Sequence, residues 1–245
     1  MKPRLMYGFH AVKARLRAAP QSVIEVWVDE NRQDARMRDF LAVLAQAGLA
    51  AHMADGGRLD KMVGGARHQG VVAKVEPVKM ARTLAEVIEA VEGAPLIIVL
   101  DGVTDPHNLG AVLRSADAFG AHAVIAPKDR AVGLNSTVEK VASGAAETVP
   151  YLMVTNLARS LDELKEFQVW TVAMEADAPR TLDKIDAKGG IAWVLGAEGW
   201  GLRQLTRKTC DDAARIPISG TVESLNVSVS AAICLYETAR QRGVK

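Results

Sequence analysis

The sequence predicts an α/β protein, with a small N-terminal α/β unit and a larger C-terminal unit built on a mostly parallel sheet. Three observations favour this class. Short apolar runs of strand length alternate with stretches whose apolar residues recur at helical spacing. The C-terminal runs are apolar on both faces, which is typical of parallel strands covered by helices on both sides. The 245 residues are 49% hydrophobic and 24% charged, as in ordinary globular proteins.

The N-terminal unit is expected over residues 1–75, where helical and strand patterns alternate. Its second amphipathic stretch stops at Gly48, a residue type that commonly follows the end of a helix. Residues 76–83 have neither period and are expected to form a linker. The elements expected in this unit are helices at 8–19, 35–47 and 59–63 and strands at 23–28 and 71–75.

The C-terminal unit is expected over residues 84–245. Thr83 and Glu86 have the spacing of a capping box, which predicts that a helix begins there. The regular alternation that follows predicts a parallel sheet with connecting helices. The expected strands are 96–100, 121–126, 169–174, 191–195 and 213–218, and the expected helices are 108–119, 135–143, 157–167, 201–208 and 227–240.

The composition excludes several classes of protein. No apolar run approaches the ~18 residues that a membrane-spanning helix needs, so we expect no membrane association. The first residues, MKPRLMYGFH, contain no apolar segment of a secretory signal. Cys210 and Cys234 belong to no Cys or His cluster, so we expect free thiols, no metal site and a reducing, cytoplasmic location.

Charge is distributed unevenly along the chain, although the net charge is only +1. Residues 1–75 carry 12 Lys and Arg against 7 Asp and Glu, a net charge of +5, and the remainder carries −4. A basic N-terminal third is typical of a module that binds a polyanion. The alternative reading is ordinary variation of surface charge.

Candidate site residues follow three of the expected strands, because ligands of open parallel sheets bind beyond the carboxyl ends of the strands. After residue 100 the chain reads DGVTDPHNLGAVLRSADAFG, with Asn108 as the expected N-cap of the next helix. In that helix Arg114 lies about 160° from the middle of the apolar face. It is therefore either a solvated surface arginine or a guanidinium aimed at a phosphate or a developing oxyanion.

The other two turns are rich in glycine, serine and asparagine. In GAEGWG, after residue 195, Glu198 either caps a helix that begins at Gly201 or orients an arginine or asparagine across the site. After residue 218, Ser224 and Asn226 either cap the last helix or help its N-terminus to bind a carboxylate. The sequence contains no dinucleotide-binding or P-loop glycine motif and no evident Ser–His–Asp order.

At these three turns the sequence resembles the SpoU/TrmH family of S-adenosylmethionine-dependent RNA ribose 2′-O-methyltransferases. The matching segments are DPHNLGAVLRSADAFG, IAWVLGAEGWGL and IPISGTVESLNVSVSAAICLYE, and the resemblance covers about residues 84–245. It implies a C-terminal α/β knot (a deep trefoil knot), a homodimer formed through this domain and S-adenosylmethionine as cofactor. The positions it implies are Gly196, Ile216 and Leu225 for cofactor contacts and Asn108, Arg114, Glu198, Ser224 and Asn226 for the catalytic site.

The resemblance is narrower than the family. The segments YGFHAVKARL, RHQGVVA, ASGAAETVP and VTNLARSL are similar to those of the bacterial subgroup that methylates a guanosine ribose in the peptidyl-transferase region of 23S rRNA. In that subgroup the N-terminal unit is a small, ribosomal-protein-like domain that binds RNA. The resemblance therefore implies that residues 1–75 bind large-subunit rRNA, and the +5 charge of this part agrees with that.

The chemistry expected of such a site is electrostatic. A ribose 2′-hydroxyl is a weak acid and a poor nucleophile, so the site must position the oxygen and ease the loss of its proton. We expect Arg114 to stabilise the developing negative charge, because an arginine side chain, with a pKa of ~12 or more, is costly to deprotonate and use as a base.

Other functions remain open from the sequence alone. The same chemistry could act on a tRNA guanosine or on a resistance-conferring rRNA site. A non-catalytic RNA-binding or assembly protein would keep the fold and bind cofactor without methyl transfer, although the complete set of polar site residues speaks against it. A nicotinamide- or nucleotide-dependent enzyme should show a glycine motif that this chain lacks.

Overall fold

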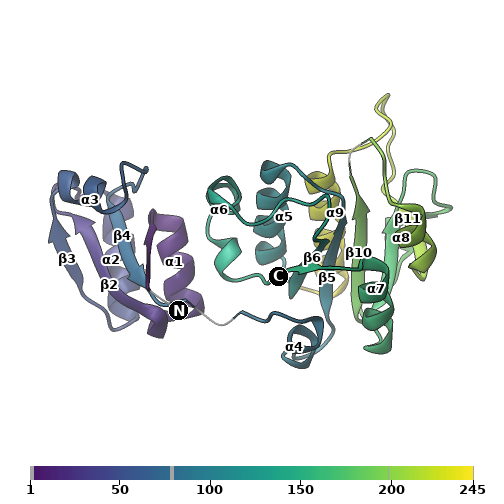
Figure 1. Ribbon diagram of the computed structural model, residues 1–245, viewed down its shortest axis with the longest axis horizontal. Helices are drawn as coiled ribbons and strands as arrows, with labels where there is room; N and C mark the ends of the chain where they lie inside the picture. The colour runs from purple at the N-terminus through teal and green to yellow at the C-terminus, as the bar shows by residue number, and fades with distance from the viewer. Residues whose placement is uncertain (1–2, 78–79, 198, 245) are drawn as a thin grey trace. The chain divides into compact units, whose positions relative to one another are not determined.

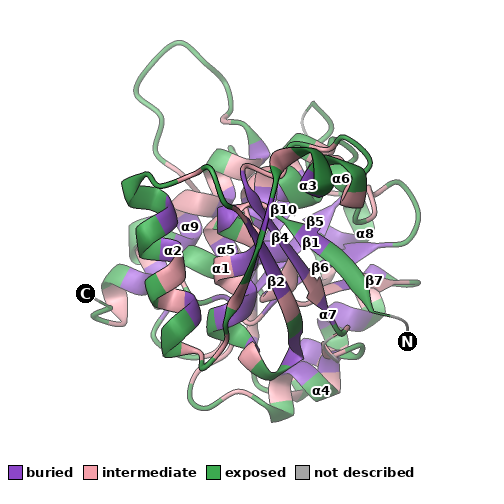
Figure 2. Ribbon diagram, turned by 90° about the vertical axis from the view of Figure 1, so that its left-hand side faces the viewer, coloured by how far each residue is buried: buried purple, intermediate pink, exposed green. Residues whose placement is uncertain are grey.

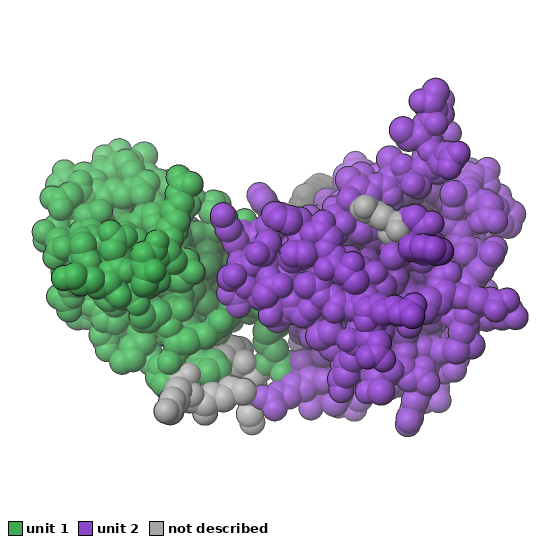
Figure 3. Space-filling view, turned by 45° about the horizontal axis from the view of Figure 1, so that its top comes forward, with its two compact units in different colours: residues 1–80, 143–148 green, residues 81–142, 149–245 purple. Residues whose placement is uncertain are grey.

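The computed structural model describes residues 3–77, 80–197 and 199–244, and it divides into two compact units (Figure 3). Unit 1 comprises residues 1–80 together with 143–148, and unit 2 comprises residues 81–142 and 149–245. Among the described residues, no helix has both the length and the apolar character needed to cross a membrane.

Unit 1 is built on a four-stranded mixed sheet in the order β1-β4-β2-β3. β2 runs parallel to β3, whereas β4 runs antiparallel to both β1 and β2. The elements are strands β1 (Arg4–Tyr7), β2 (Val23–Asp29), β3 (Ala51–Ala54) and β4 (Val71–Val75) and helices α1 (Phe9–Ala18), α2 (Ala35–Gln46) and α3 (Gly56–Met62). Strands β1 and β3 were not among the predicted strands.

Apolar residues cover both faces of this sheet. On one face Phe9 of α1 meets Phe40 of α2 edge to face, with ring centroids 5.6 Å apart, above Val26 of β2. On the other face Leu59 of α3 packs with Trp27 of β2. The period-2 pattern of β2 thus places alternate residues against helices on opposite sides.

Residues 143–148 belong to unit 1 although they lie far from it in the sequence. The Glu147 carboxylate forms ion pairs with Arg4 and Arg15, and the Arg15 side chain is only 3% exposed. The local sequence gives no signal for this association, because ion pairs between distant segments leave no period.

Unit 2 is built on a seven-stranded parallel sheet in the order β7-β6-β5-β10-β8-β11-β9. The predicted α/β class with a mostly parallel sheet is therefore confirmed. The strands are β5 (Leu96–Asp101), β6 (Ala123–Pro127), β7 (Tyr151–Val154), β8 (Trp170–Met174), β9 (Arg180–Thr181), β10 (Ile191–Gly196) and β11 (Asp212–Arg215). Every residue of β5 and β6 is buried, as the apolar runs predicted. Figure 2 colours buried residues purple.

Helices cover the two faces of this sheet (Figure 1). α5 packs against α6 and α9 on one face, where the Trp193 indole of β10 donates a hydrogen bond of 2.9 Å to Thr238 Oγ1 of α9. α4 and α8 pack against α7 on the other face. The helices are α4 (Leu84–Glu89), α5 (Pro106–Ala118), α6 (Ser136–Ala142), α7 (Leu157–Glu166), α8 (Gln204–Thr209) and α9 (Val227–Gln241).

Three boundary predictions next to the candidate site residues are wrong. Asn108 is not the N-cap of α5; the Asp105 side chain accepts the capping hydrogen bond from His107 N at 2.9 Å, with Pro106 in the first helical position. Aspartate is as good an N-cap as asparagine, and proline favours the position that follows. α8 begins at Gln204 rather than at residue 201, and the strand expected at 213–218 ends at Arg215. The predicted cap at Thr83 is confirmed, because Thr83 Oγ1 accepts from Glu86 N at 3.2 Å.

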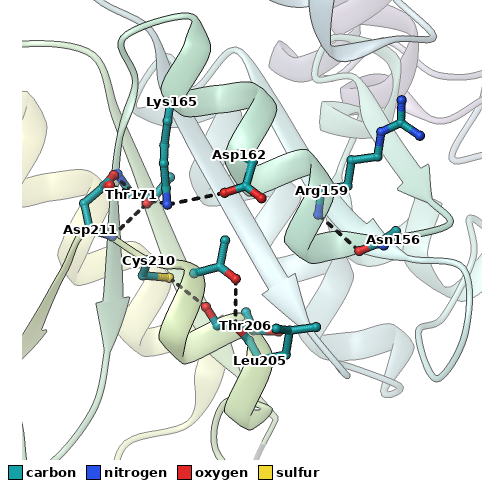
Figure 4. Close-up of polar contacts among 10 residues, drawn as sticks. Asn156, Arg159, Asp162, Lys165, Thr171, Leu205, Thr206, Cys210 and Asp211 are labelled. Atoms are coloured by element: carbon teal, nitrogen blue, oxygen red, sulfur yellow. Dashed lines mark hydrogen bonds and ion pairs between the residues drawn. The ribbon is translucent and has the colours of Figure 1, made fainter.

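A polar cluster joins the start of β11 to β8 (Figure 4). Asp211 Oδ2 accepts hydrogen bonds from Thr171 N at 2.9 Å and from Thr171 Oγ1 at 2.7 Å, and Thr171 is fully buried. Lys165 of α7 lies 3.6 Å from Asp211 and 3.5 Å from Asp162.

Near this cluster, the Cys210 thiol donates to Thr206 O at 3.3 Å, and burial raises the pKa of Cys210 to about 12. Burial also raises the pKa of Cys234 on α9.

We expect Asp211→Ala to lower the free energy of unfolding by about 1–3 kcal/mol, because it leaves a buried backbone N–H without its acceptor. Asp211→Asn keeps an acceptor oxygen and should cost less. The control is Asp162→Ala, whose carboxylate is 64% exposed and forms only a long ion pair. Denaturant unfolding of the three variants measures the difference. Equal stability of the Asp211 and Asp162 alanine variants would show that the cluster contributes nothing.

Candidate functional site

The carboxyl ends of β8 and β10 open into a cavity of about 640 Å³. Four of the predicted positions, Gly196, Ile216, Ser224 and Leu225, line it. They come from the end of β10 and from the segment that joins β11 to α9. The strand-end rule points to these two segments from the sequence, whereas the individual positions Gly196, Ile216 and Leu225 come from the family resemblance. The volume is within the range of ordinary small-molecule sites, roughly 300–1,000 Å³.

The turn after β10 packs directly on Gly196. Gly201 N donates to Ala197 O at 3.0 Å and closes the turn, while Gly199 and Gly201 adopt φ angles of 83° and 67° that favour glycine. A Cβ atom on Gly196 would lie 2.1 Å from the carbonyl carbon of Gly201. Only glycine at position 196 lets the turn approach the strand this closely.

The far end of the turn is held by a residue that the sequence reading missed. Asp101, the last residue of β5, has a fully buried carboxylate. It accepts a hydrogen bond from Arg203 N at 3.0 Å and lies 3.1 Å from Arg203 Nε. Hydrogen bonds therefore hold Gly201 to Ala197 and Arg203 to Asp101. The position of Asp101 at a strand end was the available signal.

Acidic side chains form a second part of the cavity wall. Glu175 and Asp177 follow β8, and Glu223 lies before α9. Arg207 Nε of α8 lies 2.8 Å from Glu175 Oε2. Burial raises the pKa of Glu175, an effect that Arg207 opposes and Asp177 reinforces. Among the described residues, the wall therefore carries three carboxylates and one guanidinium, which suits a ligand with positive charge.

A smaller cavity of about 330 Å³ lies beside the first and is lined by Asn108 of α5. Asn226 Nδ2 donates to Asn108 Oδ1 at 3.0 Å, and Asn226 Oδ1 accepts from Ser228 N at 2.9 Å as the N-cap of α9. The structure therefore brings the predicted pair Asn108 and Asn226 together. Ala197 and Trp200 of the turn also line this cavity.

Arg114 is exposed on α5, as predicted, and does not belong to the apolar face of that helix. Arg114 is not one of the described residues that line the two cavities. Glu198, the remaining predicted site residue, lies outside the described part of the chain. The described residues contain no group of three or more His, Cys, Asp or Glu side chains that could hold a metal ion.

Family models match both parts of the sequence. Residues 95–236 match the SpoU rRNA methylase family, and residues 5–81 match a domain described as RNA 2′-O ribose methyltransferase substrate binding. The chain is 57% identical over 243 residues to a 23S rRNA (guanosine-2′-O-)-methyltransferase, RlmB, of Ralstonia nicotianae, covering 99% of this chain and 98% of the relative. It is 56% identical over 239 residues to the protein of the same name of Bordetella pertussis, covering 98% of each chain.

Solved structures share the fold. A structure described as an RNA 2′-O ribose methyltransferase is 28% identical, with a TM-score of 0.75, and the match covers 99% of this chain and 90% of the other. The methyltransferase AviRb of Streptomyces viridochromogenes, in complex with AdoMet, is 22% identical, with a TM-score of 0.73, and the match covers 99% of this chain and 92% of the other. The chain therefore belongs to the SpoU rRNA methylase family.

Proposed function

We propose that this protein transfers a methyl group from S-adenosylmethionine to the ribose 2′-oxygen of a guanosine in the peptidyl-transferase region of 23S rRNA. The observation that carries the proposal is the identity of 56–57% to curated 23S rRNA guanosine 2′-O-methyltransferases over nearly the whole chain. The substrate-binding match and the methylase match together span residues 5–81 and 95–236 of this chain. With this substrate we propose a cytoplasmic location.

The residues of the larger cavity fit S-adenosylmethionine. That molecule carries a sulfonium and an ammonium group, and the wall offers Glu175, Asp177 and Glu223 to them. Arg207 can meet its carboxylate. Gly196, Ile216 and Leu225 would contact it largely through backbone groups, because the glycine at the end of β10 admits a close approach. When bound, the cofactor supplies a methyl group already activated by the sulfonium.

We expect Glu175→Gln to weaken S-adenosylmethionine binding roughly 10-fold, because it removes a charged acceptor from the cavity wall.

The same change should not lower the stability of the folded protein at pH 8. Burial raises the folded-state pKa of Glu175, so its stabilising contribution is complete below the ordinary pKa and is lost as pH rises. The Tm difference between Gln variant and wild type should therefore be zero or positive at pH 8 and shrink toward acidic pH. Titration calorimetry and thermal scans at both pH values test this; a destabilised Gln variant at pH 8 would contradict it.

The chain's own residues then act on the 2′-hydroxyl. Arg114 stabilises the negative charge that develops on the oxygen and holds the neighbouring phosphate. Asn108 and Asn226, hydrogen-bonded to each other at 3.0 Å, fix the ends of α5 and α9 at the smaller cavity. Glu198 orients the arginine, and Ser224 offers a hydroxyl at the rim of the larger cavity.

We also propose that the active form is a homodimer joined through unit 2. α9 carries a stripe of exposed or half-buried apolar residues at helical spacing, Val229, Ala232, Ile233 and Tyr236. Such an exposed stripe is typical of an interface. Arg114 lines neither cavity of its own chain. We therefore propose that its guanidinium contacts the substrate bound at the cavities of the second copy.

Two further features complete the proposal. Residues 1–75 form the RNA-binding domain, which uses its excess of Lys and Arg for phosphate contacts that weaken with salt.

Residues 84–245 form the catalytic domain, with 76–83 as linker. This domain is a deep trefoil knot: the segment from β11 to α9 threads beside the 197–203 turn. The two segments line one cavity, and α9 packs back on β10, which supports that threading.

Methyl transfer to defined RNA tests the function. The purified protein, S-adenosylmethionine and in vitro 23S rRNA fragments should give one ribose-methylated guanosine, detected as a block to alkaline cleavage. A full-length tRNA transcript is the matched alternative substrate. Methylation of the tRNA but not the rRNA would move the assignment to a tRNA enzyme, and cofactor binding without transfer to either would favour an assembly protein.

A further inference from the structure

Trp200 is the most exposed large apolar side chain in the described part of the chain. It is 92% exposed, whereas Trp27 is 9% exposed, Trp193 is fully buried and Trp170 is of intermediate exposure. An indole has a large apolar surface, and leaving it in water forgoes the free energy of burying it. Such a ring in a glycine-rich turn beside two cavities therefore suggests a ligand that covers it.

The backbone under this indole is held firmly. Trp200 lies between Gly199 and Gly201 in the turn that Gly201 N closes on Ala197 O at 3.0 Å. Beyond the turn, the backbone N–H of residue 203 is bound to the buried carboxylate of Asp101. A tryptophan side chain has only two torsion angles, so the ring loses little conformational freedom when a planar ligand stacks on it.

The position of Trp200 is informative because it lines both cavities. One is the proposed S-adenosylmethionine site, and the other contains Asn108, to which Asn226 is hydrogen-bonded. In a ribose methylated at this boundary, the reacting oxygen is bonded to C2′ and the base is bonded to the neighbouring carbon, C1′. The base of that nucleotide or of its neighbour must therefore lie close to the boundary.

The charge around this boundary does not attract RNA. The charged residues lining the two cavities are Glu175, Asp177, Glu223 and Asp105, with Arg207 as the sole cation among the described ones. Phosphate contacts with these walls would be unfavourable. Stacking needs no charge, because every base has a π-face, and tryptophan offers a large one.

We propose that Trp200 is a stacking platform for a nucleobase of the RNA substrate at or next to the methylated nucleotide. This inference rests on the proposed RNA-methylating function of the same site. Stacking positions the nucleotide for methyl transfer but does not distinguish one base from another, so other residues must select guanosine.

The test compares Trp200→Phe, Trp200→Leu and Trp200→Ala in the full-length protein on the 23S rRNA fragment. We expect the Ala variant to raise KM for RNA roughly 10- to 100-fold, since base–aromatic stacking has about that effect. The Phe variant should retain most of the affinity for RNA. The Leu variant, whose side chain is apolar but not aromatic, should lose it. The dissociation constant for S-adenosylmethionine should change much less than the KM for RNA, because the indole is 92% exposed although it borders the larger cavity. The control is Leu205→Ala, which alters another exposed apolar side chain, 64% exposed and outside both cavities, and should leave KM unchanged.

Four results would overturn the inference. A normal KM in the Ala variant, or equal rescue by Leu and Phe, would exclude stacking. A parallel loss of S-adenosylmethionine affinity would place the indole on the cofactor. A change of oligomeric state in the Ala variant, seen by light scattering, would place it in a protein interface.

A fluorescence titration separates this inference from the proposed function. RNA stacked on Trp200 should quench emission in wild type, and the quenched component should be missing in Trp200→Phe. This signal does not require turnover. Quenching without methyl transfer would leave the stacking site standing while the function failed; transfer without quenching would leave the function standing and refute the stacking site.

Discussion

Arg114→Ala should lower kcat about 10²- to 10³-fold, the loss typical of removing one group that stabilises a developing oxyanion. S-adenosylmethionine affinity should not change, because Arg114 lines neither cavity. Arg114→Lys keeps the charge but loses the planar fork of donors, so it should recover only part of the rate. Arg159→Ala is the matched control, because Arg159 is also exposed on a helix of unit 2 (Figure 4). Single-turnover kinetics with saturating cofactor measures the effect, and near-normal turnover would refute the role.

A mixed dimer shows whether Arg114 acts on its own chain or on the partner. One chain would carry Arg114→Ala and the other Gly196→Ala, which damages the cofactor cavity. If Arg114 acts across the dimer, the mixed dimer has one complete site and about half of the wild-type rate, since one of two sites is intact. If Arg114 acts within its own chain, no site is complete and the mixture stays inactive.

Gly196→Ala should reduce S-adenosylmethionine affinity at least about 100-fold, because small displacements of a positioned site have effects of that size. The added Cβ would lie 2.1 Å from the carbonyl carbon of Gly201, a backbone atom that can move only if the whole turn shifts. The turn is also tied to Asp101 through Arg203, so a shift disturbs that buried carboxylate. The strain should lower stability by about 1–3 kcal/mol as well.

The matched control is Gly189→Ala, where an added Cβ meets no atom within 4 Å. Calorimetric titration with S-adenosylmethionine and denaturant unfolding should show it close to wild type. Cofactor binding by Gly196→Ala as tight as that of the control would mean that the larger cavity is not the cofactor site.

Much of the fold could be predicted because burial leaves a regular signal. The fully buried β5 and β6 appear as unbroken apolar runs, and the exposure of Arg114 follows from the period of α5. The start of α5 was predicted wrongly because Asp105 and Asn108 are both good caps, and the choice depends on where Pro106 fits. β9 has two residues, too few for any period.

The site was predictable in part for a similar reason. Strand ends locate ligands in parallel sheets, so the segments after β10 and β11, with Ser224, were predicted to belong to the site. The cavity positions Gly196, Ile216 and Leu225 came from the family resemblance. Asp101 and Glu175 also follow strands, but their roles depend on Arg203 and Arg207, which approach only through tertiary packing. Nothing in the local sequence specifies such pairings.

The two cysteines make this protein well suited to site-specific chemistry. Maleimides and similar alkylating reagents react with thiolates, and burial raises the pKa of Cys210 to about 12 and that of Cys234 in the same direction. At neutral pH both thiols should therefore stay unlabelled in the folded protein. A single cysteine introduced on an exposed surface would take up a dye almost without background, so RNA docking and release could be followed in real time with no prior removal of native residues.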